Sequence, residues 1–182
     1  MRQIEEWQGV DRAVFENEIG PANRPAVMRG LVRDGPAVRA GRQSPASVVD
    51  YFKRLDSGAT VTAMVGAPEN NGRFFYTDDF QAFNFGSKSV PLCTALDKFV
   101  DLAEDPQPHA IALQALNVAD LMPSFLADNA MPLIDSDIAP RAWISNRSMV
   151  APHFDNNRNI ACVVSGSRRF TVFPPEQVSN LY

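Results

Sequence analysis

Short strand-like runs follow one another closely in the C-terminal part of the chain, and this clustering most constrains the fold. Residues 141–145, 159–164 and 169–173 are rich in β-branched, aromatic or other apolar side chains, as strands are. The turn Ser165-Gly166-Ser167 separates the last two runs and predicts a hairpin. Helices and strands mix before residue 141, so the whole pattern predicts an α+β domain with a sheet-rich core.

The triplet His153-Phe154-Asp155 lies between the first two of these runs. Successive side chains of an extended strand point to opposite faces, so His153 and Asp155 are expected to share one face. An imidazole and a carboxylate on one face supply two corners of the two-histidine, one-carboxylate site that binds iron(II). The same pair can also form a hydrogen bond at a strand end without a metal, so the triplet alone leaves both interpretations open.

The earlier part of the chain has the periodicity of alternating helices and strands. Helices are expected over residues 11–18, 35–40, 44–58, 91–104 and 118–126, and strands over 25–31, 60–65, 73–76 and 109–116. Ser44 is expected to cap the helix that Pro45 begins. No linker-like stretch divides the chain, which predicts a single domain.

Composition argues against several classes of protein. The net charge of −4 gives no basic surface for nucleic acid, and no apolar run is long enough to cross a membrane. The first residues lack the basic-then-apolar layout of a signal peptide. The two cysteines, Cys93 and Cys162, are too few for a disulfide framework, so the sequence predicts a cytoplasmic protein with reduced thiols.

The motifs around the triplet stand in an order that resembles a known family. They are Trp143-Ile144-Ser145-Asn146 before it, and Asn159, Gly166-Ser167-Arg168-Arg169 and Phe170–Pro175 after it. This order is similar to that of cupin-like JmjC-type oxygenases, which are iron(II)- and 2-oxoglutarate-dependent hydroxylases. They are relatives of the asparaginyl hydroxylase that acts on hypoxia-inducible factor. The resemblance continues, more weakly, from Pro25 to Tyr182.

The resemblance implies a fold and a division of the chain. The fold would be α+β to mainly β, namely a cupin-type double-stranded β-helix, or jelly roll, with helices on its N-terminal side. Residues 1–24 would be a lead-in, and residues 25–182 would be the N-terminal portion of the cupin-like domain. The substrate would be a protein side chain, a peptide or a small metabolite, and a homodimer is compatible with this interpretation.

The resemblance also implies roles for individual residues. His153 and Asp155 would be ligands of Fe(II), and Arg168 would pair with the distal carboxylate of the cosubstrate 2-oxoglutarate. The planar fork of an arginine can hold a carboxylate through two parallel hydrogen bonds. Asn159 would line the cosubstrate pocket, and Tyr76 is a further candidate from outside the core strands. Without the resemblance, Asn159 could equally satisfy backbone groups and Arg168 could be a solvated surface residue.

The match to the family pattern is incomplete at the third iron ligand. The family's second histidine lies downstream of these motifs, whereas the one other histidine here, His109, lies upstream and is expected in a surface or capping role. One interpretation is a fragment of a longer hydroxylase, inactive on its own. We favour it because a double-stranded β-helix needs about eight strands. The other is a cupin-fold binding or scaffold protein that has lost its iron site. Whether the chain is an enzyme therefore stays open.

Overall fold

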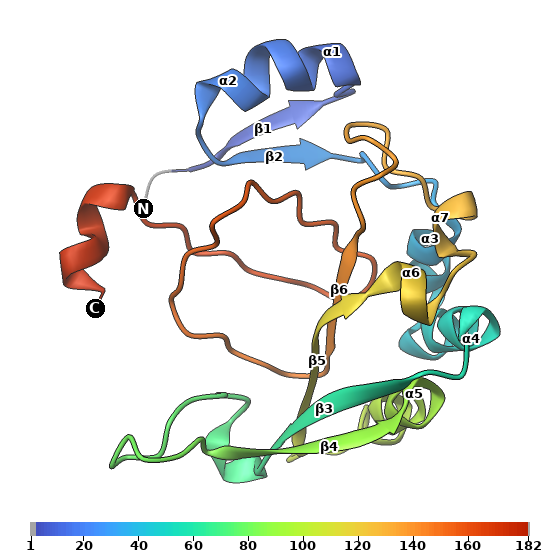
Figure 1. Ribbon diagram of the computed structural model, residues 1–182, viewed down its shortest axis with the longest axis vertical. Coiled ribbons are helices and arrows are strands. Elements are labelled where there is room, and N and C mark those ends of the chain that lie inside the picture. Colours follow the sequence, from blue (N-terminus) through green and yellow to red (C-terminus); the bar gives the residue numbers. More distant parts are fainter. Residues whose placement is uncertain (1–2, 182) are drawn as a thin grey trace.

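A four-stranded antiparallel sheet is the larger of two sheets in the computed structural model, which describes residues 3–181 (Figure 1). Its strands are β3 (Thr60–Gly66), β4 (Phe85–Pro91), β5 (Ala110–Asn117) and β6 (Arg141–Ser145). They lie in the order β4-β3-β5-β6, so β5 pairs with a strand on each side. The predicted lead-in begins with Met1 and Arg2, and the predicted domain ends at Tyr182. These three residues lie outside the described residues.

The N-terminal residues form a separate two-stranded sheet. Strand β1 (Glu5–Gln8) pairs in parallel with β2 (Ala26–Arg29), and parallel pairing requires a crossover between the strands. The crossover is one helical stretch made of α1 (Arg12–Val14), a π-helical turn (Phe15–Ile19) and α2 (Gly20–Ala22). The division at residue 24 stays a prediction, although β1 pairs with β2 across it.

Three further helices follow, and two of them pack on the sheet. They are α3 (Pro36–Gln43), α4 (Pro45–Leu55) and α5 (Leu92–Asp101). The predicted cap is confirmed, because the Ser44 hydroxyl accepts a hydrogen bond of 3.0 Å from the Ser47 amide and Pro45 is the first helical residue. The core under α4 and α5 is a set of buried apolar side chains from helices and strands: Val49, Val61, Ala63, Leu92, Leu96, Ile111, Leu113, Val118 and Leu121.

The connection from β5 to β6 contains two short helices where the sequence predicted one. They are α6 (Val118–Leu121) and α7 (Phe125–Asp128). Pro123 has no amide hydrogen and disfavours a helical conformation at the residue before it, which explains the break at Met122. The Asn129 side chain then ties this connection to α3 and α4, since it accepts from the Ala37 amide at 3.0 Å and donates to the Tyr51 hydroxyl at 2.8 Å.

Two predicted elements near β4 need correction. Residues 73–76 form no strand, because the Phe75 amide donates to the side-chain oxygen of Asn84 at 2.8 Å instead of to a neighbouring strand. Strand β4, in contrast, was not predicted. Its centre, Gly86-Ser87-Lys88-Ser89, is polar and exposed because β4 lies at the edge of the sheet and pairs only with β3.

The largest correction concerns the segment of residues 146–174, which curves away from the sheet as extended backbone (Figure 1). The strands predicted at 159–164 and 169–173 are wrong for the described structure. Strands require a hydrogen-bonded neighbour, and within residues 3–181 none pairs with these two runs. The segment touches the body at Met149, whose amide donates to Gly72 at 2.8 Å, and at Ser165, whose hydroxyl donates to Gly41 at 3.4 Å. A 3-10 helix (Pro175–Asn180) follows it.

Cys93 links α5 to the end of α4. Its thiol lies 2.9 Å from a carboxylate oxygen of Asp56, to which it donates a hydrogen bond. This hydrogen bond, together with burial and the negative charge of Asp56, raises the pKa of the Cys93 thiol above its ordinary value. A nucleophilic cysteine needs a lowered pKa, so the structure gives Cys93 a packing role.

No helix among the described residues is long and apolar enough to cross a bilayer.

We expect Leu96→Ala to lower the free energy of unfolding by about 2–5 kcal/mol, because Leu96 is fully buried and the truncation leaves a cavity. Val100→Ala on the same helix is the control, since Val100 is 38% exposed. Urea unfolding followed by circular dichroism measures both changes. Equal losses in the two variants would contradict the placement of the core.

We expect Asp56→Asn to raise the rate at which iodoacetamide alkylates Cys93 at pH 8.5. The substitution removes the acceptor and the charge that hold the thiol pKa high, so a larger fraction of the thiol ionises. Cys162→Ser serves as the background, so that a single thiol reacts, and Asp101→Asn is the matched control at the exposed end of α5. Unchanged alkylation in Asp56→Asn would show that the carboxylate does not set the reactivity.

Candidate functional site

His153 and Asp155 lie in the extended segment that follows β6. The Nε2 atom of His153 is 3.7 Å from Oδ1 of Asp155, so the two side chains lie on the same side of the chain. Alternation along extended backbone produces this arrangement even though the two residues belong to no strand. The side chains are 60% and 58% exposed, so both groups are open to solvent.

Each of the two groups is oriented by one further hydrogen bond. Nδ1 of His153 lies 2.9 Å from the carbonyl oxygen of Ala151, which can only accept, so this nitrogen carries a proton, and in the neutral ring Nε2 is the nitrogen with the free lone pair. The side-chain amide of Asn159 donates to Oδ2 of Asp155 at 2.7 Å, which leaves Oδ1 toward His153. Supporting contacts of this kind orient the ligands of metal sites. The resemblance pointed to Asn159 as a residue of the cosubstrate pocket, but it did not predict this direct contact.

The separation of the two donor atoms is close to that of two ligands of one metal ion. Imidazole nitrogen and carboxylate oxygen bind a divalent ion at about 2.0–2.2 Å, so two neighbouring ligands of one ion lie about 3–3.5 Å apart. The observed 3.7 Å is slightly wider, and a small rotation of either exposed side chain would bring both donor atoms onto one ion. Two ligands do not complete a site, however, and within residues 3–181 no three histidine, cysteine, aspartate or glutamate side chains group to hold a metal.

Asn146 explains how the chain leaves the sheet toward the triplet. Its side chain accepts from the Ile111 amide at 2.9 Å and donates to the carbonyl oxygen of His109 at 2.9 Å. Asn146 therefore continues the β5–β6 pairing for one residue beyond β6. These contacts hold the backbone of His109 at the start of β5. The imidazole of His109 is exposed there, which is the surface position that the sequence predicted.

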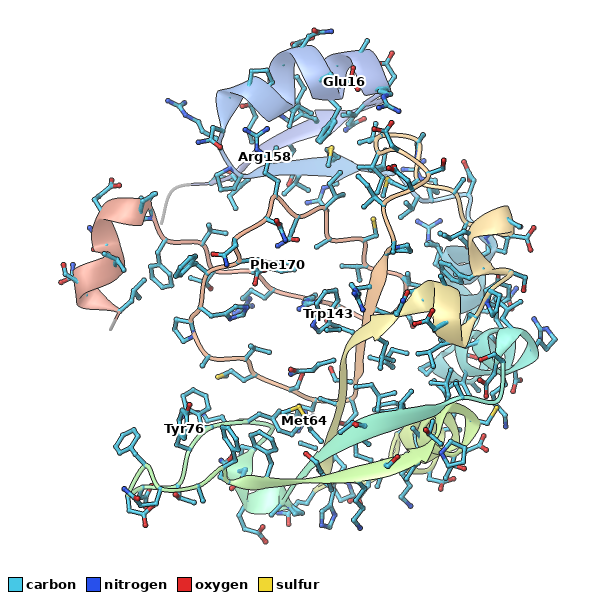
Figure 2. All side chains as sticks on the ribbon, viewed as in Figure 1. Glu16, Met64, Tyr76, Trp143, Arg158 and Phe170 are labelled. Carbon is cyan, nitrogen blue, oxygen red and sulfur yellow. The ribbon has the colours of Figure 1, made fainter. Side chains whose placement is uncertain are left out.

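Arg168 and Tyr76 each contact an aromatic ring. The guanidinium of Arg168 lies over the ring of Phe170, 4.9 Å from its centroid. Tyr76 stacks on Phe83 with ring centroids 5.1 Å apart. Figure 2 shows Phe170 toward the middle of the molecule and Tyr76 at its edge. The structure therefore brings His153, Asp155 and Asn159 together, and it places Tyr76 in a stack with Phe83 on the connection between β3 and β4.

Comparison with known proteins agrees with the motifs and the fold. The family described as Cupin-like domain matches residues 12–182. The human bifunctional peptidase and (3S)-lysyl hydroxylase JMJD7 is 25% identical over 164 residues, which are 84% of this chain and 48% of that protein. The chain thus spans about half the length of the curated relative it matches.

These similarities confirm two predictions made from the sequence. The first is the resemblance to JmjC-type cupin-like oxygenases, and the second is an α+β fold of the cupin-like, jelly-roll class. The family match covers nearly the whole chain, including the triplet and the motifs on both sides of it. The chain belongs to the cupin-like domain family.

Proposed function

We propose that this chain is the part of an iron(II)- and 2-oxoglutarate-dependent hydroxylase that supplies two of the iron ligands. The observation that carries the proposal is the pair His153 and Asp155, whose donor atoms lie 3.7 Å apart on one side of the chain. Membership of the cupin-like family supports it, and so does the similarity to a protein named as a lysyl hydroxylase. By the same similarity we propose a protein or peptide side chain as the substrate.

Different residues of the chain would bind the metal and the cosubstrate. His153 and Asp155 would hold the metal, and Asn159 would keep the Asp155 carboxylate in position through its 2.7 Å hydrogen bond. Arg168 would bind the distal carboxylate of 2-oxoglutarate with its parallel N–H groups. Iron(II) with 2-oxoglutarate supplies the oxidising chemistry of C–H hydroxylation when bound. We also propose the cytoplasm as the compartment, since Cys93 and Cys162 are both free thiols.

A second candidate function is a cupin-fold binding or scaffold protein that has lost the iron site. It is favoured by one observation, namely that no group of three metal-ligating side chains occurs within residues 3–181. The two candidates differ in whether His153 binds metal at all. A metal titration therefore separates them before any substrate is known.

We expect the tag-free chain to bind Mn(II), a stand-in for Fe(II), weakly and through His153. His153→Ala should reduce the affinity by about tenfold or more, because one of two protein ligands is lost. His109→Ala is the matched control, since His109 is the other histidine in the sequence and should leave the affinity unchanged. Electron paramagnetic resonance of free Mn(II) gives both dissociation constants.

Two outcomes of this titration would count against the proposal. If the two histidine variants bind Mn(II) as well as the unchanged chain does, His153 is not a ligand and the scaffold function is favoured. If His109→Ala loses as much affinity as His153→Ala, the ligand assignment is wrong.

We expect Arg168→Ala to weaken 2-oxoglutarate binding by about tenfold to a hundredfold in the presence of Mn(II), with the Mn(II) affinity unchanged. Loss of a charge-assisted contact to a carboxylate costs about 1.5–3 kcal/mol. Arg169→Ala is the control, because it removes the same charge one residue away. Calorimetry measures the affinities, and equal losses in the two variants would mean that only net charge matters.

We expect the 182 residues on their own to convert no 2-oxoglutarate to succinate above the level of His153→Ala. Two protein ligands retain iron poorly and leave more of its coordination sphere to water. The chain is reconstituted with Fe(II) without oxygen, then exposed to oxygen and 2-oxoglutarate while succinate is followed. Succinate above the control level would mean that these residues complete the site by a ligand outside the pair.

A further inference from the structure

The connection between β3 and β4 carries an unusual concentration of aromatic side chains. We call residues 73–85 the aromatic connection, which contains six aromatic residues: Phe74, Phe75, Tyr76, Phe80, Phe83 and Phe85. Three of them are well exposed, namely Phe80 at 77%, Phe83 at 58% and Tyr76 at 56%. Figure 2 shows Tyr76 on this connection at the edge of the molecule. Exposed apolar side chains gathered at one place mark interaction surfaces.

The exposed rings are held in a row that begins in the core. Phe74 is buried against the sheet and meets Phe85 edge to face, with centroids 5.3 Å apart. Phe85 stacks on Phe83 at 4.9 Å, and Phe83 stacks on Tyr76 at 5.1 Å. Each ring thus fixes the next, and the row continues from Tyr76 to Phe80 at 6.4 Å, so it ends at the most exposed of the six rings.

Side-chain amides fix the backbone under this row of rings. Asn84 accepts from the Phe75 amide at 2.8 Å and donates to the Arg73 carbonyl at 3.1 Å, so it joins the two arms of the connection. Beyond it, the Thr77 amide donates to the Ala82 carbonyl at 2.8 Å. A surface that is ordered before binding loses less conformational freedom when a partner arrives.

The charge of the connection selects the partner. Asp78 and Asp79 lie at its tip, and the sequence has no lysine or arginine between Arg73 and Lys88. The Thr77 hydroxyl and the Gln81 amide donate to Asp79, which lowers the pKa of that carboxyl and keeps it ionised. Carboxylates and the faces of aromatic rings both attract cations. Among residues 3–181, the arginines that lie over rings are over Tyr51 and Phe170, so none covers the connection.

The connection is attached next to the segment that leads to His153. Arg73 forms an isolated parallel bridge with Met149, and the Gly72 carbonyl accepts from the Met149 amide at 2.8 Å. Gly72 has φ of +80°, and a Cβ atom there would lie 2.5 Å from the carbonyl oxygen of Arg147. Only glycine permits this close approach. The base of the connection is therefore joined to the chain that enters the candidate site.

We propose that the aromatic connection binds a peptide segment that carries lysine or arginine side chains, with the cation between the exposed ring of Phe80, at the end of the row, and the carboxylate of Asp78. The segment would belong to the protein substrate, and only this last step rests on the proposed function. The binding itself requires neither metal nor 2-oxoglutarate.

The probe is the blocked peptide acetyl-Ser-Lys-Ser-Lys-Ser-Lys-Ser-amide, and its control replaces each lysine with norleucine, which has a similar length and no charge. We expect the lysine peptide to shift the amide NMR signals of residues 73–85, and the norleucine peptide to bind about tenfold more weakly or worse. The titration uses the whole chain without metal, so a negative result is distinct from failure of catalysis.

Matched variants test which groups bind. Phe80→Ala with Phe83→Ala should weaken lysine-peptide binding about tenfold, whereas Phe173→Ala, at a 45% exposed phenylalanine outside the connection, should not. Asp78→Asn should weaken binding severalfold, and Asp101→Asn should not. Circular dichroism establishes that each variant is folded.

Three results would overturn the proposal. The first is equal affinity for the lysine and norleucine peptides, and the second is a lysine-dependent shift that maps outside residues 73–85. The third is self-association of the chain that Phe80→Ala with Phe83→Ala abolishes while no peptide binds. That result would make the connection a contact between copies of the chain.

Discussion

Burial of strand β5 is the interaction on which the rest of the structure depends. Residues 110–113 are all buried, and Leu113 is fully buried together with Leu92 and Leu96 of α5. β5 pairs with β3 on one side and with β6 on the other, so its burial also fixes the positions of these two strands. The aromatic connection follows β3 in the chain, and the His153–Asp155 pair follows β6. Both surfaces therefore begin at strands that pair with the buried strand β5.

The two surfaces differ in how firmly the fold holds them. The aromatic connection has a buried ring, Phe74, and a closing side chain, Asn84. The pair His153 and Asp155 is exposed and relies on short-range hydrogen bonds to Ala151 and Asn159. Exposed polar contacts contribute little free energy because water competes for both partners. The proposed recognition surface thus stands on the packed part of the molecule, and the proposed metal ligands stand on the open part.

Local chemistry made some features predictable from the sequence. The hydroxyl of Ser44 and the ring of Pro45 act within one turn, so the start of α4 followed from two adjacent residues. The shared side of His153 and Asp155 followed from the alternation of extended backbone, which needs no partner strand. The family was recognisable because its motifs are contiguous in sequence.

Features that depend on distant partners were not predictable. The runs at 159–164 and 169–173 have strand-forming residues, but a strand also needs a neighbour, which no local pattern specifies. The polar centre of β4 has no strand-like pattern, and the strand forms through its pairing with β3. The stacking of Tyr76 on Phe83, seven residues away, likewise depends on a contact that the local sequence does not specify.

The closure at Asn84 has a consequence for how this domain can change over evolution. Within the described part of the chain, the hydrogen bonds of residues 77–82 join these residues only to one another. The side chain of Asn84 joins the two arms of the connection between this stretch and the sheet. Insertions or exchanges in such a stretch leave the core untouched. Residues 77–82 can therefore be exchanged without altering the hydrogen bonds that orient His153 and Asp155. The same boundary marks a natural place for grafting a recognition sequence from another protein.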